Sequence, residues 1–219
     1  RQTARMAMSF TDVISTTRSI RKIKPDPVPA DVLERVLQAA VWAPSGGNRQ
    51  PWRMVVVRDQ AVKRKLRDLY VDEWATYVDF NMQNVSKASQ EVKDRTAAAL
   101  APGTALADTL DQVPVIVMFV HDARLIYVTD NELGRTSVVG GASLYPAVQN
   151  LLTAARAEGL GGVLTPLICR REPEVQAILG LPKDWAVHAM VPLGWPRGSH
   201  GPLTRMPLED MVRYDRWVD

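Results

Sequence analysis

The sequence predicts one domain of mixed α and β structure built around a central sheet. Three short runs rich in β-branched residues indicate strands, and the stretches between them carry helical spacing of apolar residues. The expected strands are Met54–Val57, Val113–Val120 and Ala186–Leu193. Strands separated by helices are typical of α/β and α+β folds. Three strands are few for a chain of 219 residues, so at least one more is expected.

Two helices are expected before the first strand. Ser9 can cap the first helix, which runs to about Thr17. A proline-rich break follows, and the second helix is expected from Pro29 to near Trp42, because apolar residues recur at helical spacing over 33–41. Residues 1–8 are expected to form a flexible N-terminus and residues 9–219 a single domain.

A helical excursion is expected between the first two strands. Ala61 to Ala99 has a helical but untidy pattern with many charges, and the breaker sequence Ala101–Thr104 is expected to close it. We interpret the excursion, at about 61–110, as a lid over a site.

Two further helices are expected in the second half of the chain. One extends from Gly134 to Glu158 and stops at Gly159, whose φ freedom suits a helix end. Pro146 lies inside this stretch, so it either kinks the helix or marks its true start. A short helix is expected at Glu172–Leu179.

Composition excludes several classes of function. The 27 basic and 24 acidic residues are intermixed and give a net charge of only +3, which provides no electrostatic footprint for nucleic acid or an anionic membrane. Val113–Val120 is the longest apolar run and is too short to span a bilayer. Cys169 is the single cysteine, so no intramolecular disulfide forms and the expected compartment is the cytoplasm. His121, His188 and His200 lack metal-ligand spacing, so no metal is expected.

Three segments carry residue types suited to ligand binding. Two arginines flank a hydroxyl in Arg18–Arg21, where their forked donors could hold a phosphate dianion; a solvated helix end is the alternative. Pro44–Trp52 combines glycines, which allow a planar ligand to approach the backbone, with polar side chains; the alternative is a helix-to-strand turn. Gly159–Leu167 is a third glycine loop, and it carries the hydroxyl of Thr165.

Taken together and in this order, these segments resemble the nitroreductase superfamily of FMN-dependent oxidoreductases, from about Val13 to Val212. The family's Arg-Arg-Ser-x-Arg motif is matched by Thr-Arg-Ser-Ile-Arg at 17–21, with threonine at the first place. Its Ala-Pro-Ser-x-x-Asn-x-Gln-Pro-Trp motif is matched at every fixed position over 43–52. A Gln-Asn-Leu-Leu-x-Ala-Ala helix at 149–155 and the Leu-Gly-Trp-Pro stretch at 193–196 are similar to the family's later motifs.

The resemblance implies an α+β, three-layer fold with a central, mostly antiparallel sheet flanked by helices. It also implies an intertwined homodimer with two FMN molecules at the subunit interface. Arg18, Ser19, Arg21 and Arg205 would hold the phosphate, while Ser45 and Asn48 would come from the partner subunit. The full set of residues implied around FMN is Arg18, Ser19, Ile20, Arg21, Pro44, Ser45, Gly46, Gly47, Asn48, Gln50, Val163, Leu164, Thr165 and Arg205.

Some details are similar to the branch of the superfamily that contains iodotyrosine deiodinases. The branch places a threonine hydroxyl on flavin N5, which here implies that Thr165 tunes the flavin; a turn cap before Pro166 is the alternative. Glu73 and Tyr77, four residues apart on one helix face, resemble the lid pair that grips the substrate. A solvated lid face is their alternative. The branch also uses a lysine where this chain has Ala107.

The function implied is the reduction of a nitroaromatic, quinone or similar conjugated acceptor by NAD(P)H, through a ping-pong mechanism on FMN. Two alternatives stay open. One is a reductive dehalogenase of a halogenated phenol, which Thr165 favours and Ala107 disfavours. The other is a flavin-binding or storage protein without turnover.

Overall fold

The computed structural model describes residues 8–217. A four-stranded antiparallel sheet lies at its centre, with the strands in the order β1-β2-β4-β3. The strands are β1 Trp52–Val57, β2 Val115–Asp122, β3 Gly161–Gly162 and β4 Trp185–Gly194. β3 is the additional strand that the chain length led us to expect. It consists of two glycines and has no strand signal of its own.

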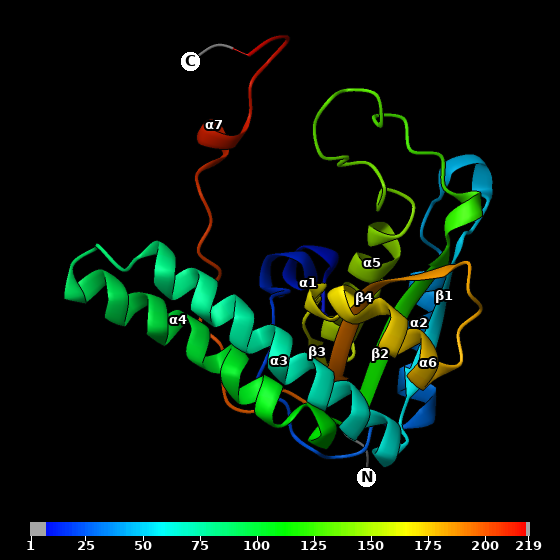
Figure 1. Ribbon diagram of the computed structural model, residues 1–219, viewed down its shortest axis with the longest axis horizontal. Coiled ribbons are helices and arrows are strands. Elements are labelled where there is room, and N and C mark those ends of the chain that lie inside the picture. The colour runs from blue at the N-terminus through cyan, green and yellow to red at the C-terminus, as the bar shows by residue number, and fades with distance from the viewer. Residues whose placement is uncertain (1–7, 218–219) are drawn as a thin grey trace.

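Seven α-helices occur in the described part of the chain (Figure 1). They are α1 Phe10–Thr16, α2 Ala30–Val41, α3 Gln60–Asn84, α4 Gln90–Asp108, α5 Tyr145–Ala157, α6 Glu172–Leu179 and α7 Leu208–Met211. Of these, α1, α2 and α6 lie where the sequence predicts them. Residues 1–7, within the expected flexible N-terminus, lie outside the described residues.

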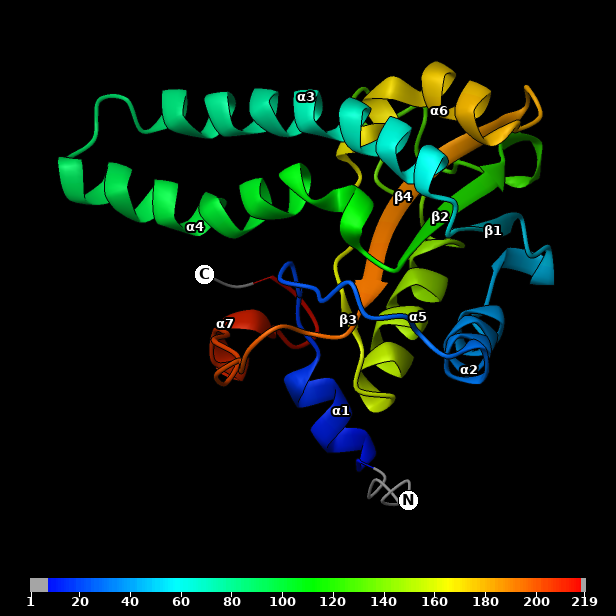
Figure 2. The same cartoon turned by 90° about the horizontal axis from the view of Figure 1, so that it is seen from below.

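Helices cover both faces of the sheet, which gives three layers (Figures 1 and 2). Successive residues of β2 point to opposite faces, so Val117 and Phe119 join one core while Ile116 and Met118 join the other. α2 and α5 close the first core, and α3, α4 and α6 contribute to the second. Burial on both faces explains why β2 is a continuous apolar run rather than an alternating one.

The long helix expected from Gly134 is wrong, because α5 begins only at Tyr145. Pro146 lies in its first turn, where the missing N–H costs nothing, so the proline marks the true start. The preceding segment is organised instead by the buried carboxylate of Asp130. It accepts hydrogen bonds from the Val138 backbone and the Ser137 hydroxyl, which lower the Asp130 pKa.

The breaker sequence Ala101–Thr104 does not close the helical excursion, because α4 continues through Pro102 to Asp108. Packing against α3 accounts for the difference. A Cβ at Gly103 would lie 2.1 Å from a ring carbon of Trp74, so glycine is what allows the indole to lie against α4. The indole N–H also donates to Thr104 Oγ1 at 2.9 Å. These contacts hold the helix together where local propensity would end it.

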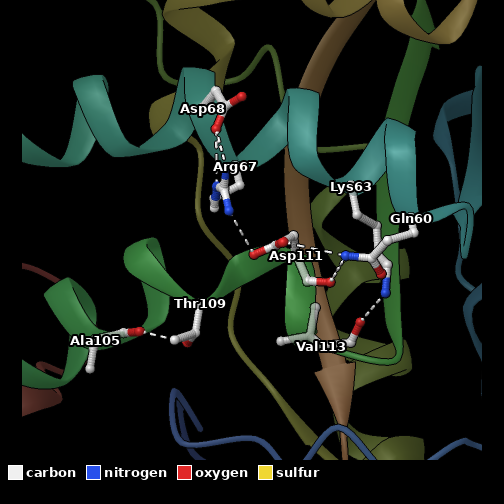
Figure 3. Close-up of polar contacts among 8 residues, drawn as sticks. All are labelled: Gln60, Lys63, Arg67, Asp68, Ala105, Thr109, Asp111 and Val113. Atoms are coloured by element: carbon white, nitrogen blue, oxygen red, sulfur yellow. Dashed lines mark hydrogen bonds and ion pairs between the residues drawn. The ribbon is translucent and has the colours of Figure 1, made fainter.

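α3 and α4 form an antiparallel hairpin that projects beyond the sheet (Figure 2). Its base is fixed by polar contacts to the segment before β2 (Figure 3). The buried ammonium of Lys63 donates to the Val113 carbonyl at 2.7 Å, and Arg67 pairs with Asp111 at 3.2 Å. Burial lowers the Lys63 pKa, against the opposing charge of Asp111. The hairpin is therefore anchored at one end and exposed toward its tip.

Candidate functional site

The segment Arg18–Arg21 lies along β3, at one edge of the sheet. Ser19 pairs with Gly162 in a parallel bridge, and the Ile20 amide donates to the Gly162 carbonyl at 2.8 Å. The Ile20 side chain is buried against Gly161, where a Cβ would lie 2.7 Å from it. Glycine at 161 thus lets the arginine segment approach the sheet closely.

A cavity of about 360 Å³ opens beside this edge. Its wall contains Arg18, Arg156, the β3 backbone and the loop over 198–203, and none of its lining residues is acidic. The Arg18 guanidinium donates to the Gly201 carbonyl at 2.6 Å, which ties the loop to the arginine segment. Two guanidiniums without a carboxylate make this cavity suited to an anion.

The other residues predicted to hold the phosphate lie around this cavity rather than in its wall. Ser19 is exposed, and Arg205 is exposed two residues beyond the cavity loop, donating to the Thr204 carbonyl at 2.8 Å. Arg21 lines a second hollow, of about 400 Å³, together with Trp74 and Tyr77 of α3. Arg21 therefore lies between the sheet edge and the helical hairpin.

Thr165 is buried, with 6% of its surface exposed, and its backbone pairs with Met190 of β4. Its Oγ1 lies 3.0 Å from the Tyr70 hydroxyl, and either group can donate. Burial raises the Tyr70 pKa, while the hydrogen bond to Thr165 and the charge of Arg21 oppose the shift. The hydroxyl thus contacts α3 and not the turn at Pro166. Val163 and Leu164, also predicted near the flavin, precede it as buried and half-buried residues.

Glu73 and Tyr77 share α3 but face different neighbours. The Glu73 carboxylate pairs with the guanidiniums of Arg170 at 3.2 Å and Arg171 at 3.9 Å, in the short 3-10 helix η4 at Leu167–Arg171. Tyr77 is 39% exposed, lines the second hollow and packs with its ring centroid 5.4 Å from that of Trp74. Of the predicted lid pair, Tyr77 lines the second hollow with Arg21, whereas Glu73 faces the arginines of η4.

The loop Pro44–Gln50 contains left-handed backbone at three positions. Gly47, Asn48 and Gln50 have φ values of 58°, 51° and 47°. Such angles are uncommon outside glycine and concentrate at functional sites. Ser45 stabilises the conformation by accepting from the Gln50 amide at 2.9 Å, and the Gly46 amide donates to Ser143 Oγ at 3.0 Å.

This loop and the arginine segment lie at opposite edges of the sheet. The loop leads directly into β1, the first strand of the order, whereas Ser19 pairs beside β3, the last. Figure 2 shows β1 on the side of the molecule away from the projecting tip of the hairpin. One chain therefore does not bring Ser45 or Asn48 to the cavity that contains Arg18.

Two residues that contact the predicted site residues or line the cavity carry no sequence signal: Tyr70, buried against Thr165, and Arg156 in the cavity wall. Tyr70 lies in the expected lid stretch, where nothing local marks it as a partner of Thr165. Arg156 occupies the last turn of α5, a place where a cation is ordinary because of the helix dipole. Neither carries a motif, so only the tertiary contacts identify them.

Residues 8–217 contain neither a candidate metal site nor a candidate membrane span. No group of three or more metal-ligating side chains gathers among them, and none of their helices is long and apolar enough to cross a membrane. The Cys169 thiol is half-buried, and burial raises its pKa to about 11, which keeps it protonated at neutral pH.

The chain belongs to the nitroreductase family, whose model matches residues 14–195. This agrees with the α+β, three-layer fold described above. A protein named NADH dehydrogenase from Thermus thermophilus is 34% identical over 204 residues, covering 89% of this chain and 90% of that protein. Iodotyrosine deiodinase 1 from Rattus norvegicus is 29% identical, covering 94% of this chain and 69% of the relative.

A solved structure has the same fold. It is an oxidized iodotyrosine deiodinase bound to FMN and 3-iodo-L-tyrosine, with a TM-score of 0.72 and 23% sequence identity. The match covers 95% of this chain and all of that one. At this identity the likeness concerns the fold.

Proposed function

We propose that the protein is an FMN-dependent oxidoreductase that uses NAD(P)H to reduce a nitroaromatic, a quinone or a similar conjugated small molecule. The observation that carries the proposal is the anion cavity whose wall contains Arg18 and Arg156, in a nitroreductase-family chain. The NADH dehydrogenase name of one relative supports the nicotinamide donor, and the FMN-bound neighbour supports the cofactor.

The residues present fit FMN. A phosphate dianion requires cations and no neighbouring carboxylate, which the cavity wall provides. Arg18 would hold the phosphate with Ser19 and Arg205, and the flavin ring would extend toward Arg21 and Thr165. When bound, FMN supplies the transfer of two electrons from the nicotinamide to the acceptor, and the use of one site by both supports a ping-pong mechanism.

The chain's own groups then position and shield the reactants. Arg21 places a fixed positive charge beside the hairpin, where it also acts on Tyr70. Thr165 offers one hydroxyl whose other partner is Tyr70, so its orientation is restrained before any ligand arrives. Trp74 and Tyr77 form an aromatic wall on α3, which supports the interpretation of the hairpin as a lid.

We propose that the working unit is a homodimer in which each site draws on both chains. The loop Pro44–Gln50 lies at the wrong edge of the sheet to serve its own chain's cavity. β1 is an edge strand with no partner on its outer side within residues 8–217, and edge strands of this kind favour pairing. The C-terminal tail is also extended and carries exposed apolar residues, namely Met206, Leu208, Met211, Tyr214 and Trp217.

A second candidate function is reductive dehalogenation of a halogenated phenol. The buried Thr165 hydroxyl and Tyr77 on the hairpin favour it, as do the deiodinase relatives. The Glu73 carboxylate is already paired with arginines of η4, and Ala107 is buried in α4, so neither offers a free charged group to an amino-acid substrate. The third candidate function is flavin binding or storage without catalytic turnover. The single cysteine supports a cytoplasmic setting for each of them.

The test begins with the purified protein. We expect it to be yellow, to release about one FMN per chain on heating, and to be reduced anaerobically by NADH or NADPH. A panel of nitroaromatics, quinones and halophenols then separates the candidates by which acceptor reoxidises the flavin. Release of FAD, or no binding of FMN at micromolar levels, would contradict the central proposal, and binding without nicotinamide oxidation would favour the third function.

A further inference from the structure

The anion cavity lacks one charge that the family motif would supply. Threonine stands at position 17, where the resemblance places the first arginine of Arg-Arg-Ser-x-Arg. Thr17 lines the cavity, but its hydroxyl donates to the Val13 carbonyl at 2.7 Å, which turns it toward α1. The N-terminal segment therefore contributes a single guanidinium, that of Arg18, to the wall.

A second guanidinium reaches the same wall from a different element. Arg156 lies in the last turn of α5 and lines the cavity beside Thr16 and Thr17. Its Nε donates to Thr16 Oγ1 at 2.8 Å, across 140 residues of sequence. This contact places the guanidinium next to the position that the missing arginine would occupy.

Arg156 also keeps its charge available. None of the ion pairs among residues 8–217 includes it, and no acidic residue lines the cavity. The arginines elsewhere contrast with it, since Arg35, Arg124 and Arg171 each pair with a carboxylate. The helix dipole explains why a cation is favourable in the last turn of α5, but it does not explain why this cation lines a cavity without acidic residues.

We propose that Arg156 is a phosphate-binding residue that takes over the charge lost at position 17. The inference rests on the proposed FMN function and specifies how this chain holds the phosphate. Arginine binds a dianion through forked donors, and the contact to Thr16 uses Nε, so the two Nη groups are left for the phosphate. The phosphate is thereby held by α5 as well as by the N-terminal segment.

The test compares FMN with riboflavin, which has the same ring and ribityl chain but no phosphate. Arg156→Ala should weaken FMN binding by about 10–150-fold, the loss expected for one charge-assisted contact, and leave riboflavin binding unchanged. Fluorescence titration of the apoprotein measures both constants without reference to activity. If the alanine variant unfolds, Arg156→Gln provides the same comparison with a longer neutral side chain. Arg64→Ala, at an exposed position of α3, controls for the change in net charge.

Rescue makes the assignment specific. Thr17→Arg combined with Arg156→Ala should restore most of the FMN affinity, because it returns the cation to the place given by the motif. Equal losses for FMN and riboflavin, or an unchanged FMN constant in Arg156→Ala, would overturn the inference. If the parent protein binds riboflavin and FMN equally well, the phosphate site itself is wrong, and if it binds neither, the proposed function fails with it.

Discussion

The two edges of the sheet differ in how completely one chain builds them. At the β3 edge the arginine segment is bonded to the sheet, Thr165 is bonded to Tyr70, and a walled cavity results. At the β1 edge the loop Pro44–Gln50 is mostly exposed, and the outer side of the strand is unpaired within residues 8–217.

This difference separates two ways of holding a ligand. At the β3 edge, close packing fixes the geometry, because Gly161 and Ile20 leave no space for another atom between them. At the β1 edge, the loop has a strained backbone instead, because Asn48 and Gln50 adopt left-handed angles. In the proposed homodimer the partner chain would complete the site at the strained and exposed loop, whereas the packed edge is formed within one chain.

The largest effect is expected from filling the close contact at the β3 edge. In Gly161→Val the added atoms collide with Ile20, which should lower the free energy of unfolding by about 1–3 kcal/mol or more and displace Arg18 from its cavity. Gly47→Ala at the other edge places the new Cβ in ordinary contact with the Arg49 side chain, at 3.8 Å, and should cost only about 1–2 kcal/mol, through its positive φ. Urea unfolding measures both, and equal losses would remove the contrast between the edges.

The next effect concerns the phosphate. Arg18→Ala should weaken FMN binding by about 10–150-fold and change the redox behaviour of the flavin far less, because it removes one charge-assisted contact at the end remote from the ring. Arg205→Ala should act similarly if the C-terminal tail reaches the same phosphate. Fluorescence titration checks both variants, and unchanged dissociation constants would place these arginines outside the site.

A smaller effect is expected at the β1 edge, where neutral contacts are lost. Ser45→Ala combined with Asn48→Ala should weaken FMN binding by about 5–150-fold through two hydrogen bonds. This variant can be unfolded and refolded together with Arg18→Ala, so that half of the dimers contain one chain of each kind. In a mixed dimer, one site combines an intact Arg18 with an intact loop and the other site has both changes. Roughly a quarter of all sites should therefore recover FMN binding. Recovery of none, or an FMN-loaded monomer in sedimentation, would contradict a shared site.

Thr165→Ala tests the hydroxyl proposed to face flavin N5. Loss of one hydrogen bond worth about 0.5–1.5 kcal/mol should shift the two-electron midpoint potential of bound FMN by about 10–30 mV. Thr165→Ser should retain the parent potential, whereas Tyr70→Phe removes only the restraint on the hydroxyl. The same potential in Thr165→Ala and parent would show that the hydroxyl serves α3 alone and would weaken the dehalogenase candidate.

The most gradual change is expected from acid. His188 lies at a bulge of β4 with its Nδ1 3.0 Å from that of His121, and burial with the charge of His121 lowers its pKa to about 4. The unfolded chain takes up this proton near pH 6.5, so stability is complete above that pH and falls between about 6.5 and 4.

Each bound proton contributes a slope of up to about 1.4 kcal/mol per pH unit. The pKa of His121 is also lowered by burial, although the carboxylates of Glu172 and Asp122 oppose the shift. Thermal unfolding of parent and His188→Gln across this range measures the effect. A parallel pH dependence in the two proteins would exclude the histidine pair as its source.

Local signals in the sequence determined much of the fold and the motifs. The Ser9 cap, the apolar spacing of α2 and the acidic first turn of α6 act within one or two helical turns, so those helices lie where they are expected. Matching the motifs at 17–21 and 43–52 identified the family in the same way, because each depends on neighbouring residues.

Long-range contacts decided the rest. Two glycines form β3 only because β4 and the arginine segment pair with them, and α4 passes Pro102 because Trp74 packs on Gly103. Arg156 enters the anion cavity because α5 ends beside Thr16. Propensities of a few tenths to about 1 kcal/mol per residue are outweighed by buried packing and paired backbone worth several times as much. The chain therefore carries its motifs locally, while the tertiary structure alone decides which side chains share a cavity.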